Sequence, residues 1–149
     1  MHIALTVHLL SFAILAGGAV GANVLYRSLR AAIARNAAEA ALLVQTMFRF
    51  SITAQIGAGL MLLSGIWLLG SEHWAFWGQG WLTVKLALYV LLVLNGPLVA
   101  RPAAQRLAVA LTSGASQEVA ALLRRLDVFD VVQMTGLAAI VILAVLKPF

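Results

Sequence analysis

The stretch IALTVHLLSFAILAGGAVGANVL, residues 3–25, decides the fold class of this chain. It is apolar for longer than the roughly 20 residues that a helix needs to cross the hydrocarbon core of a bilayer. Three similar runs follow at about residues 48–69, 81–100 and 128–146. The composition agrees, because 63% of the 149 residues are hydrophobic and 10% are charged, far from the balance of soluble domains. We therefore predict an all-α, integral membrane four-helix bundle that forms one domain over residues 1–149.

The connections between these runs differ in charge, and the difference predicts an orientation. Arginines lie in and around the first and third connections, at positions 27, 30, 35 and 49 and at positions 101, 106, 124 and 125. The middle connection, residues 70–80, holds no Lys or Arg, and the four tryptophans gather around it, at positions 67, 74, 77 and 81. Positively charged connections stay in the cytoplasm, and tryptophans mark a membrane interface. Both termini and the middle connection are therefore expected outside.

The net charge of +5 does not indicate a nucleic-acid partner. Nucleic-acid binding needs basic residues gathered on a water-exposed face together with stacking aromatics, whereas these arginines flank apolar runs. Arginines in such places set topology and meet anionic lipid head groups. The expected partner is the lipid bilayer. The chain has no cysteine, which excludes disulfides and thiolate metal sites.

Two breaks mark the ends of the predicted spans. Gly96, Pro97 and Pro102 are expected to end the third span near residue 100, because proline removes a backbone donor and strains the preceding turn. Ahead of the fourth span, Ser116 is a candidate helix cap for an amphipathic lead-in through Leu122, Leu123 and Leu126.

His8 and Lys85 are the candidate functional residues, because each interrupts an apolar run where a bilayer makes an ionisable group costly. Both lie about five residues past the outer ends of their spans, roughly 7 Å below the outer interface at 1.5 Å per residue. We expect them to share one cavity. Two simpler interpretations stay open: His8 can be an interfacial residue, and Lys85 can extend its ammonium to the head groups.

Polar and small residues form one stripe on each expected helix, at the spacing of a single helical face. Membrane helices turn such residues toward each other, which predicts a polar seam inside the bundle. A lone GxxxG at Gly17 and Gly21 is a weak signal for close packing. Asp127 and Asp130 are expected to pair with Arg124 and Arg125. The four stripes are His8, Ser11, Leu15, Gly18 and Ala22; Ser51, Gln55, Ala58, Leu62 and Gly65; Lys85, Tyr89, Leu92, Asn95 and Gly96; and Asp130, Gln133, Gly136, Ile140 and Lys147.

Four segments together resemble the HemJ-type protoporphyrinogen oxidases and, more loosely, the copper-resistance D-like four-span membrane proteins. They cover nearly the whole chain, and the third, with Trp-Leu two residues before Lys85, is the most specific. They are HLLSFAILAGG (8–18), MFRFSITAQIGAGLMLLSGIWLL (47–69), GWLTVKLAL (80–88) and AAIVILAVLKPF (138–149).

The resemblance implies a multi-pass protein of the bacterial cytoplasmic (inner) membrane that binds b-type haem and oxidises a porphyrin substrate, protoporphyrinogen IX. It implies one essential His and one essential Lys, which match His8 and Lys85. His8 would ligate the haem iron, and Lys85 would pair with a propionate or accept a proton. Both would be catalytic, and Ser11 and Tyr89 on the same faces would join them in holding the cofactor. A membrane quinone is the candidate electron acceptor.

The fourth span departs from the resemblance. The stretch DVFDVVQMTG, residues 127–136, stands where the family carries an Asn-Glu-x-Pro element. Two alternatives to the oxidase therefore stay open: a non-catalytic haem-binding electron carrier or accessory subunit of a larger membrane complex, and a structural or transport protein without haem. Copper transport has little support, because only His8 and the scattered Met61 and Met134 offer ligands for a soft ion. The sequence also leaves a homo-oligomer open.

Overall fold

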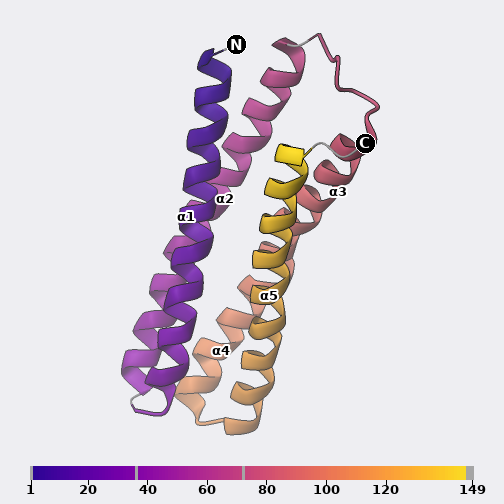
Figure 1. The fold of residues 1–149 in the computed structure, drawn as a ribbon. Helices are drawn as coiled ribbons and strands as arrows, with labels where there is room; N and C mark the ends of the chain where they lie inside the picture. Colours follow the sequence, from indigo (N-terminus) through magenta and orange to yellow (C-terminus); the bar gives the residue numbers. More distant parts are fainter. Residues whose placement is uncertain (1, 36, 72, 147–149) are drawn as a thin grey trace.

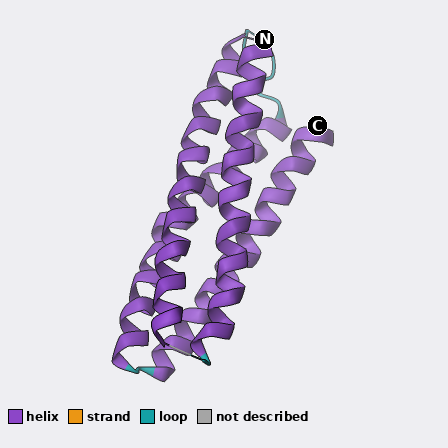
Figure 2. Ribbon diagram, turned by 90° about the vertical axis from the view of Figure 1, so that its left-hand side faces the viewer, coloured by secondary structure: helices purple, strands orange, loops and turns teal. Residues whose placement is uncertain are grey.

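The structure, a computed structural model, describes residues 2–35, 37–71 and 73–146. These residues contain no strand, and helices run almost their whole length, with loops at the two ends of the bundle (Figures 1 and 2). The predicted all-α bundle is confirmed. The elements are α1 (His2–Ile33), α2 (Ala37–Ser71), α3 (Gly80–Asn95), the π-helical segment η1 (Gly96–Ala100), α4 (Arg101–Ser113) and α5 (Ser116–Leu146).

Four continuous helical stretches are long and apolar enough to cross a membrane. Each contains one of the expected spans and extends beyond it. At 1.5 Å per residue, the 32 residues of α1 reach about 48 Å, well beyond a core of about 30 Å. The arginines expected in connections therefore lie mostly on helices. The four stretches are His2–Ile33, Glu39–Ser71, Gly80–Ser113 and Ser116–Leu146.

The third span does not end at its glycine and prolines, contrary to the prediction. The chain stays helical through η1, which contains Pro97, and continues as α4 to Ser113. A π-helical turn is wider than an α-helical one, so it accommodates a residue that cannot donate a backbone hydrogen bond. Pro102 sits in the first turn of α4, where proline is tolerated. The helix ends instead at Gly114, which takes a left-handed conformation with φ 72°.

The bundle has two distinct ends. The described chain starts and finishes toward the same end, which also carries the loop of residues 73–79; we call it the terminal end (Figure 1). The turns that join α1 to α2 and α4 to α5 lie at the opposite end, the arginine-rich end (Figure 1). Which end faces the cytoplasm stays a prediction.

Glycines bring α1 and α2 into close contact. A Cβ on Gly18 would lie 2.6 Å from the backbone nitrogen of Ala54, and a Cβ on Gly57 would lie 2.5 Å from that of Leu15. Neither backbone can move aside, so both positions require glycine. Gly21 of the GxxxG pair packs against Phe50, whereas a Cβ on Gly17 would meet nothing within 4 Å. Small residues therefore permit the helix approach expected in a membrane, but through Gly18 and Gly57.

Two clusters of buried side chains hold the helices together. The larger lies at the arginine-rich end, where α1, α2, α4 and α5 meet, and the smaller lies nearer the middle of the bundle. The larger cluster is Tyr26, Leu29, Ala32, Ala40, Val44, Ala103, Ala104, Leu107, Ala110, Leu122 and Leu126. The smaller cluster is Leu15, Ala58, Met61, Tyr89, Leu92 and Ile140.

The described residues of the predicted stripes are buried or half-buried except on α2, where Gln55 and Leu62 are exposed. Leu62 is 43% exposed, while Met61 and Ser64 are buried. The predicted stripe on α2 contains Leu62. The face of α2 that packs on α1 instead contains Gly57, Met61 and Ser64. Lys147 of the fourth stripe and the final Lys-Pro-Phe lie outside the described residues.

Candidate functional site

His8 lies near the terminal end, where its ring is fixed against α2. Its Nδ1 is 3.0 Å from the hydroxyl oxygen of Ser64, which is 3% exposed. The ring also packs over Gly65, since a Cβ there would lie 3.5 Å from Cε1 of His8. A glycine after a buried serine therefore leaves both space and a hydrogen-bonding partner for the imidazole.

The hydrogen bonds around Ser64 favour one tautomer of His8. The Ser64 hydroxyl has a single proton, and it donates to the backbone carbonyl of Leu60 at 2.8 Å or of Met61 at 3.1 Å. Its lone pair then accepts from Nδ1–H of His8. The Met61 carbonyl is a further acceptor beside the ring. With the proton on Nδ1, Nε2 keeps a lone pair, which is the form of histidine that binds a metal.

Lys85 on α3 lies close enough to His8 for their charges to interact. Both side chains are half-buried. The sequence predicts these two residues at one depth; in the structure both lie toward the terminal end, on α1 and α3, and neither lines the cavity described below.

Ser11 and Tyr89 lie deeper on the same helices and are already hydrogen-bonded. The Ser11 hydroxyl, 2% exposed, donates to the carbonyl of Val7 at 2.7 Å within its own helix. The Tyr89 hydroxyl donates to the carbonyl of Ala58 and so joins α3 to α2. Both residues therefore frame the region below His8.

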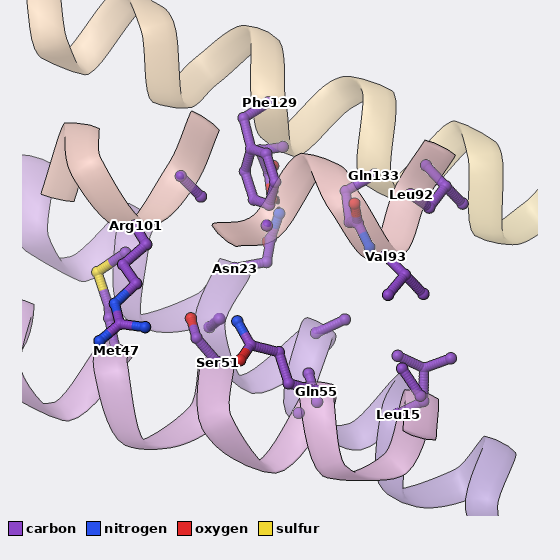
Figure 3. A pocket seen from close by; sticks show the side chains of 18 of the residues that line it. Leu15, Asn23, Met47, Ser51, Gln55, Leu92, Val93, Arg101, Phe129 and Gln133 are labelled. Carbon is purple, nitrogen blue, oxygen red and sulfur yellow. Dashed lines mark hydrogen bonds between the residues drawn. The ribbon is translucent and has the colours of Figure 1, made fainter. Parts of the chain in front are cut away.

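A cavity of about 440 Å³ lies between the two buried clusters, beyond Tyr89 as seen from His8 (Figure 3). Residues from every helix and from η1 line it, including Tyr89, Gly96 and Ala100. His8, Lys85 and Ser11 are not among its lining residues. Leu15, seven residues after His8, marks its near edge, about 10 Å farther along α1.

Polar side chains line this cavity from four helices, with Arg101 and Gln105 contributed by α4. Gln55 on α2 and Gln133 on α5 extend into it from opposite walls, and the Gln55 amide turns toward the side of Ser51 (Figure 3). Asn23 on α1 also lines it and donates through Nδ2 to the Asp130 carboxylate on α5. Sequence reasoning placed Gln55, Gln133 and Asp130 on inward stripes but did not identify the cavity. The sequence feature that could have indicated the cavity is the presence of three carboxamide side chains, those of Asn23, Gln55 and Gln133, within apolar runs.

The carboxylates of α5 take their partners from α1 rather than from their own helix, contrary to the prediction. Arg30 pairs with Asp127 at 3.0 Å, and the buried Tyr26 places its hydroxyl 2.8 Å from the same carboxylate. Arg124 and Arg125 form no ion pair within the described part of the chain. Arg30 on the facing helix α1 lies opposite Asp127. Arg124 and Arg125, on the same helix as Asp127, do not.

Among residues 2–35, 37–71 and 73–146, no group of three or more His, Asp or Glu side chains could hold a metal ion. A porphyrin brings four nitrogen ligands of its own, so one histidine suffices as a protein ligand. One imidazole and one ammonium toward the terminal end are the donor types that a haem with one protein ligand would use.

Comparisons with known proteins place the chain in a family. No curated protein and no solved structure matched the chain. A family model described as "Predicted integral membrane protein (DUF2269)" matches residues 2–148, nearly the whole length. Together with four helices able to span a bilayer, this match identifies the chain as an integral membrane protein of the DUF2269 family.

Proposed function

We propose that this protein binds b-type haem near the terminal end of the bundle, with Nε2 of His8 as the protein ligand to iron. The observation that carries the proposal is the contact between Nδ1 of His8 and Ser64. Histidines that ligate metals usually donate their other ring N–H to a neighbouring acceptor, which fixes the tautomer and the ring orientation. Ser64, itself committed to a backbone carbonyl, supplies such an acceptor.

Lys85 supports the proposal through its charge. A haem carries two propionates, and an ammonium in a site of low dielectric forms a short, strong hydrogen bond with a carboxylate. Lys85 on α3 and His8 on α1 lie toward the same end of the bundle and influence one another electrostatically, and one bound molecule would contact both. Ser11 and Tyr89, one to two turns deeper, would form the floor below the cofactor.

We propose more specifically that the haem-bound protein oxidises a porphyrinogen. Its support is the resemblance of residues 8–18 and 80–88 to the HemJ-type oxidases and the proximity of Lys85 to His8. Bound haem would supply one-electron chemistry, with a membrane quinone as candidate acceptor. Lys85 would then take a proton from the substrate. The departure at residues 127–136 favours the alternative of a haem-binding carrier or accessory subunit.

Absorption spectra of the purified protein test the haem proposal. Wild type is expected to show a Soret band, and His8→Ala is expected to lose it while eluting as folded protein. Ser64→Ala is expected to bind haem about 10- to 100-fold more weakly, the usual effect of removing a partner of a metal-ligating histidine. His73→Ala, in the exposed loop, is the matched control and should keep the band. An unchanged spectrum in His8→Ala would show that His8 only packs.

Complementation of a strain without protoporphyrinogen oxidase separates catalyst from carrier. Wild type is expected to complement, and Lys85→Arg is expected to fail while retaining haem. The guanidinium keeps the positive charge that pairs with a propionate but stays protonated at any relevant pH, so it cannot accept a proton. Complementation by Lys85→Arg would limit Lys85 to charge pairing. Failure of wild type with haem bound would exclude the oxidase and leave the carrier.

A further inference from the structure

We propose that the cavity between Gln55 and Gln133 binds a lipid-soluble aromatic diol of the hydroquinone class. This site is distinct from the one at His8, and the inference does not rest on haem binding. Gln55 and Gln133 project into the cavity from α2 and α5, on opposite walls (Figure 3).

Gln133 carries the first step of the argument. Its Oε1 is buried and accepts no hydrogen bond from any residue in the described part of the chain. A buried acceptor without a donor is unfavourable, and native proteins contain few of them. At membrane depth, water is scarce. A ligand that fills the cavity and brings an O–H or N–H group would satisfy this oxygen.

Gln55 supplies the second contact on the opposite wall. Gln55 is exposed at the cavity, and its Nε2 lies beside η1, 3.9 Å from where a Cβ on Gly96 would stand. An amide both donates and accepts. A ligand that spans the cavity therefore needs one polar group at each of two opposite edges.

The apolar part of the lining favours a ring, while Arg101, Gln105 and the Asn23–Asp130 pair add polar groups elsewhere in the cavity. Leu15, Leu92, Leu137 and Ile140 line the cavity, and Phe129 presents its ring to it (Figure 3). An alkyl chain would leave both amides unpaired, and a sugar would place hydroxyls against leucines. A flat aromatic ring with two hydroxyls stacks on Phe129 and meets both glutamines. Pockets for small ligands combine apolar walls with a few placed polar groups in this way.

The preference for a diol follows from which atom lacks a partner. The unpaired atom of Gln133 is an acceptor, so the hydroxyl form of the ring satisfies it. The corresponding quinone or diether offers acceptors alone and does not. The cavity should therefore discriminate between two rings of nearly equal size by the presence of O–H.

Equilibrium dialysis of the purified protein against matched detergent micelles tests the proposal under anaerobic conditions. The probes are 1,4-dihydroxynaphthalene and 1,4-dimethoxynaphthalene, which share the ring. Wild type is expected to bind the diol about tenfold more tightly than the dimethoxy compound, because only the diol donates a hydrogen bond to the buried acceptor. Gln133→Leu should bind both probes alike. Gln45→Leu, the same change at an exposed position of α2 outside the cavity, should behave as wild type.

Two further variants keep the test decisive if Gln133→Leu does not fold. Gln133→Glu retains an acceptor oxygen and should keep the preference for the diol. Gln55→Leu should lower diol affinity about tenfold. Equal binding of the two probes by wild type, no uptake beyond the micelles, or full diol affinity in Gln55→Leu would overturn the proposal and assign the cavity to water or lipid. The same assay in His8→Ala protein should give wild-type values, which separates this site from the haem proposal.

Discussion

The arginine-rich end and the terminal end of the bundle are built differently. At the arginine-rich end, Leu29 and Leu107 are 0% exposed and Val44 is 1% exposed, with four helices meeting around them. Toward the terminal end, Leu9 and Leu10 of α1 are 58% and 60% exposed. The residues with unusual chemistry, His8 and Lys85, lie at this second end, outside both buried clusters. Stability and chemistry are therefore concentrated in different halves of the molecule.

Residue size explains the packed end. The helices there meet through alanines, namely Ala32 on α1, Ala40 on α2, and Ala103 and Ala110 on α4, each 0–1% exposed. Small residues let helix backbones approach closely, which favours dispersion contacts where lipid removes the hydrophobic driving force. No comparable set of alanines lines the facing helices near His8.

The largest expected effect concerns which end faces the cytoplasm, because labelling is all or none. The chain lacks cysteine, so Ser28→Cys and Ser71→Cys introduce single thiols at exposed positions toward the arginine-rich and terminal ends. A membrane-impermeant maleimide should label Ser71→Cys in intact cells and Ser28→Cys after permeabilisation, because arginine-rich connections stay inside. Labelling of both thiols from the same side would contradict four spans, and a reversed pattern would invert the orientation.

The next effect compares two leucines on α1. Leu29→Ala should lower the free energy of unfolding by about 2–5 kcal/mol, because a cavity opens in a fully buried cluster. Leu9→Ala, at a position that is 58% exposed, should change it by less than about 0.5 kcal/mol. Titration of the folded protein with sodium dodecyl sulfate in mixed micelles measures both. Equal losses would show that the terminal end is packed as tightly as the other.

The sequence predicts the bundle well because membrane helices follow simple rules. Four apolar runs imply four helices, and the 3.6-residue period identifies their inward faces. The placement of His8 and Lys85 toward one end also follows, because two spans that run in the same direction place residues of equal depth at one level; that they share one site stays a prediction. These steps need only length, periodicity and direction.

Features that depend on contacts between particular helices were missed. Proline predicted the end of the third span, but whether a helix stops or widens into a π turn depends on what packs around it. Asp127 found its partner on α1 rather than on α5, because a facing helix determines which charge lies opposite. The choice between Leu62 and Met61 depends on where Gly57 contacts Leu15. The cavity arises from all these contacts together, and no single stretch encodes it.

The smallest expected effect tests whether polar contacts or packing hold the arginine-rich end. Arg30 and Asp127 join α1 to α5 at 3.0 Å, but their side chains are 54% and 38% exposed. Ion pairs of this exposure contribute about 0–1 kcal/mol, because water screens the charges and two long side chains lose freedom. Arg30→Gln should therefore lower the free energy of unfolding by at most about 1 kcal/mol in the same titration. Arg27→Gln, at an exposed position with no ion pair in the described chain, is the control for loss of one charge.

The outcome of Arg30→Gln bears on the contrast between the two ends. Tyr26 remains after the substitution, and its hydroxyl can still donate to Asp127 or to the carbonyl of Leu123, so α1 stays joined to α5. A loss as large as that of Leu29→Ala would mean that the polar contacts, and not the buried cluster, hold these helices together. A small loss, close to that of Arg27→Gln, would assign the stability of this end to its packed leucines and alanines. The terminal end, which lacks such a cluster around His8, would then be free to vary its polar residues for binding at little cost in stability.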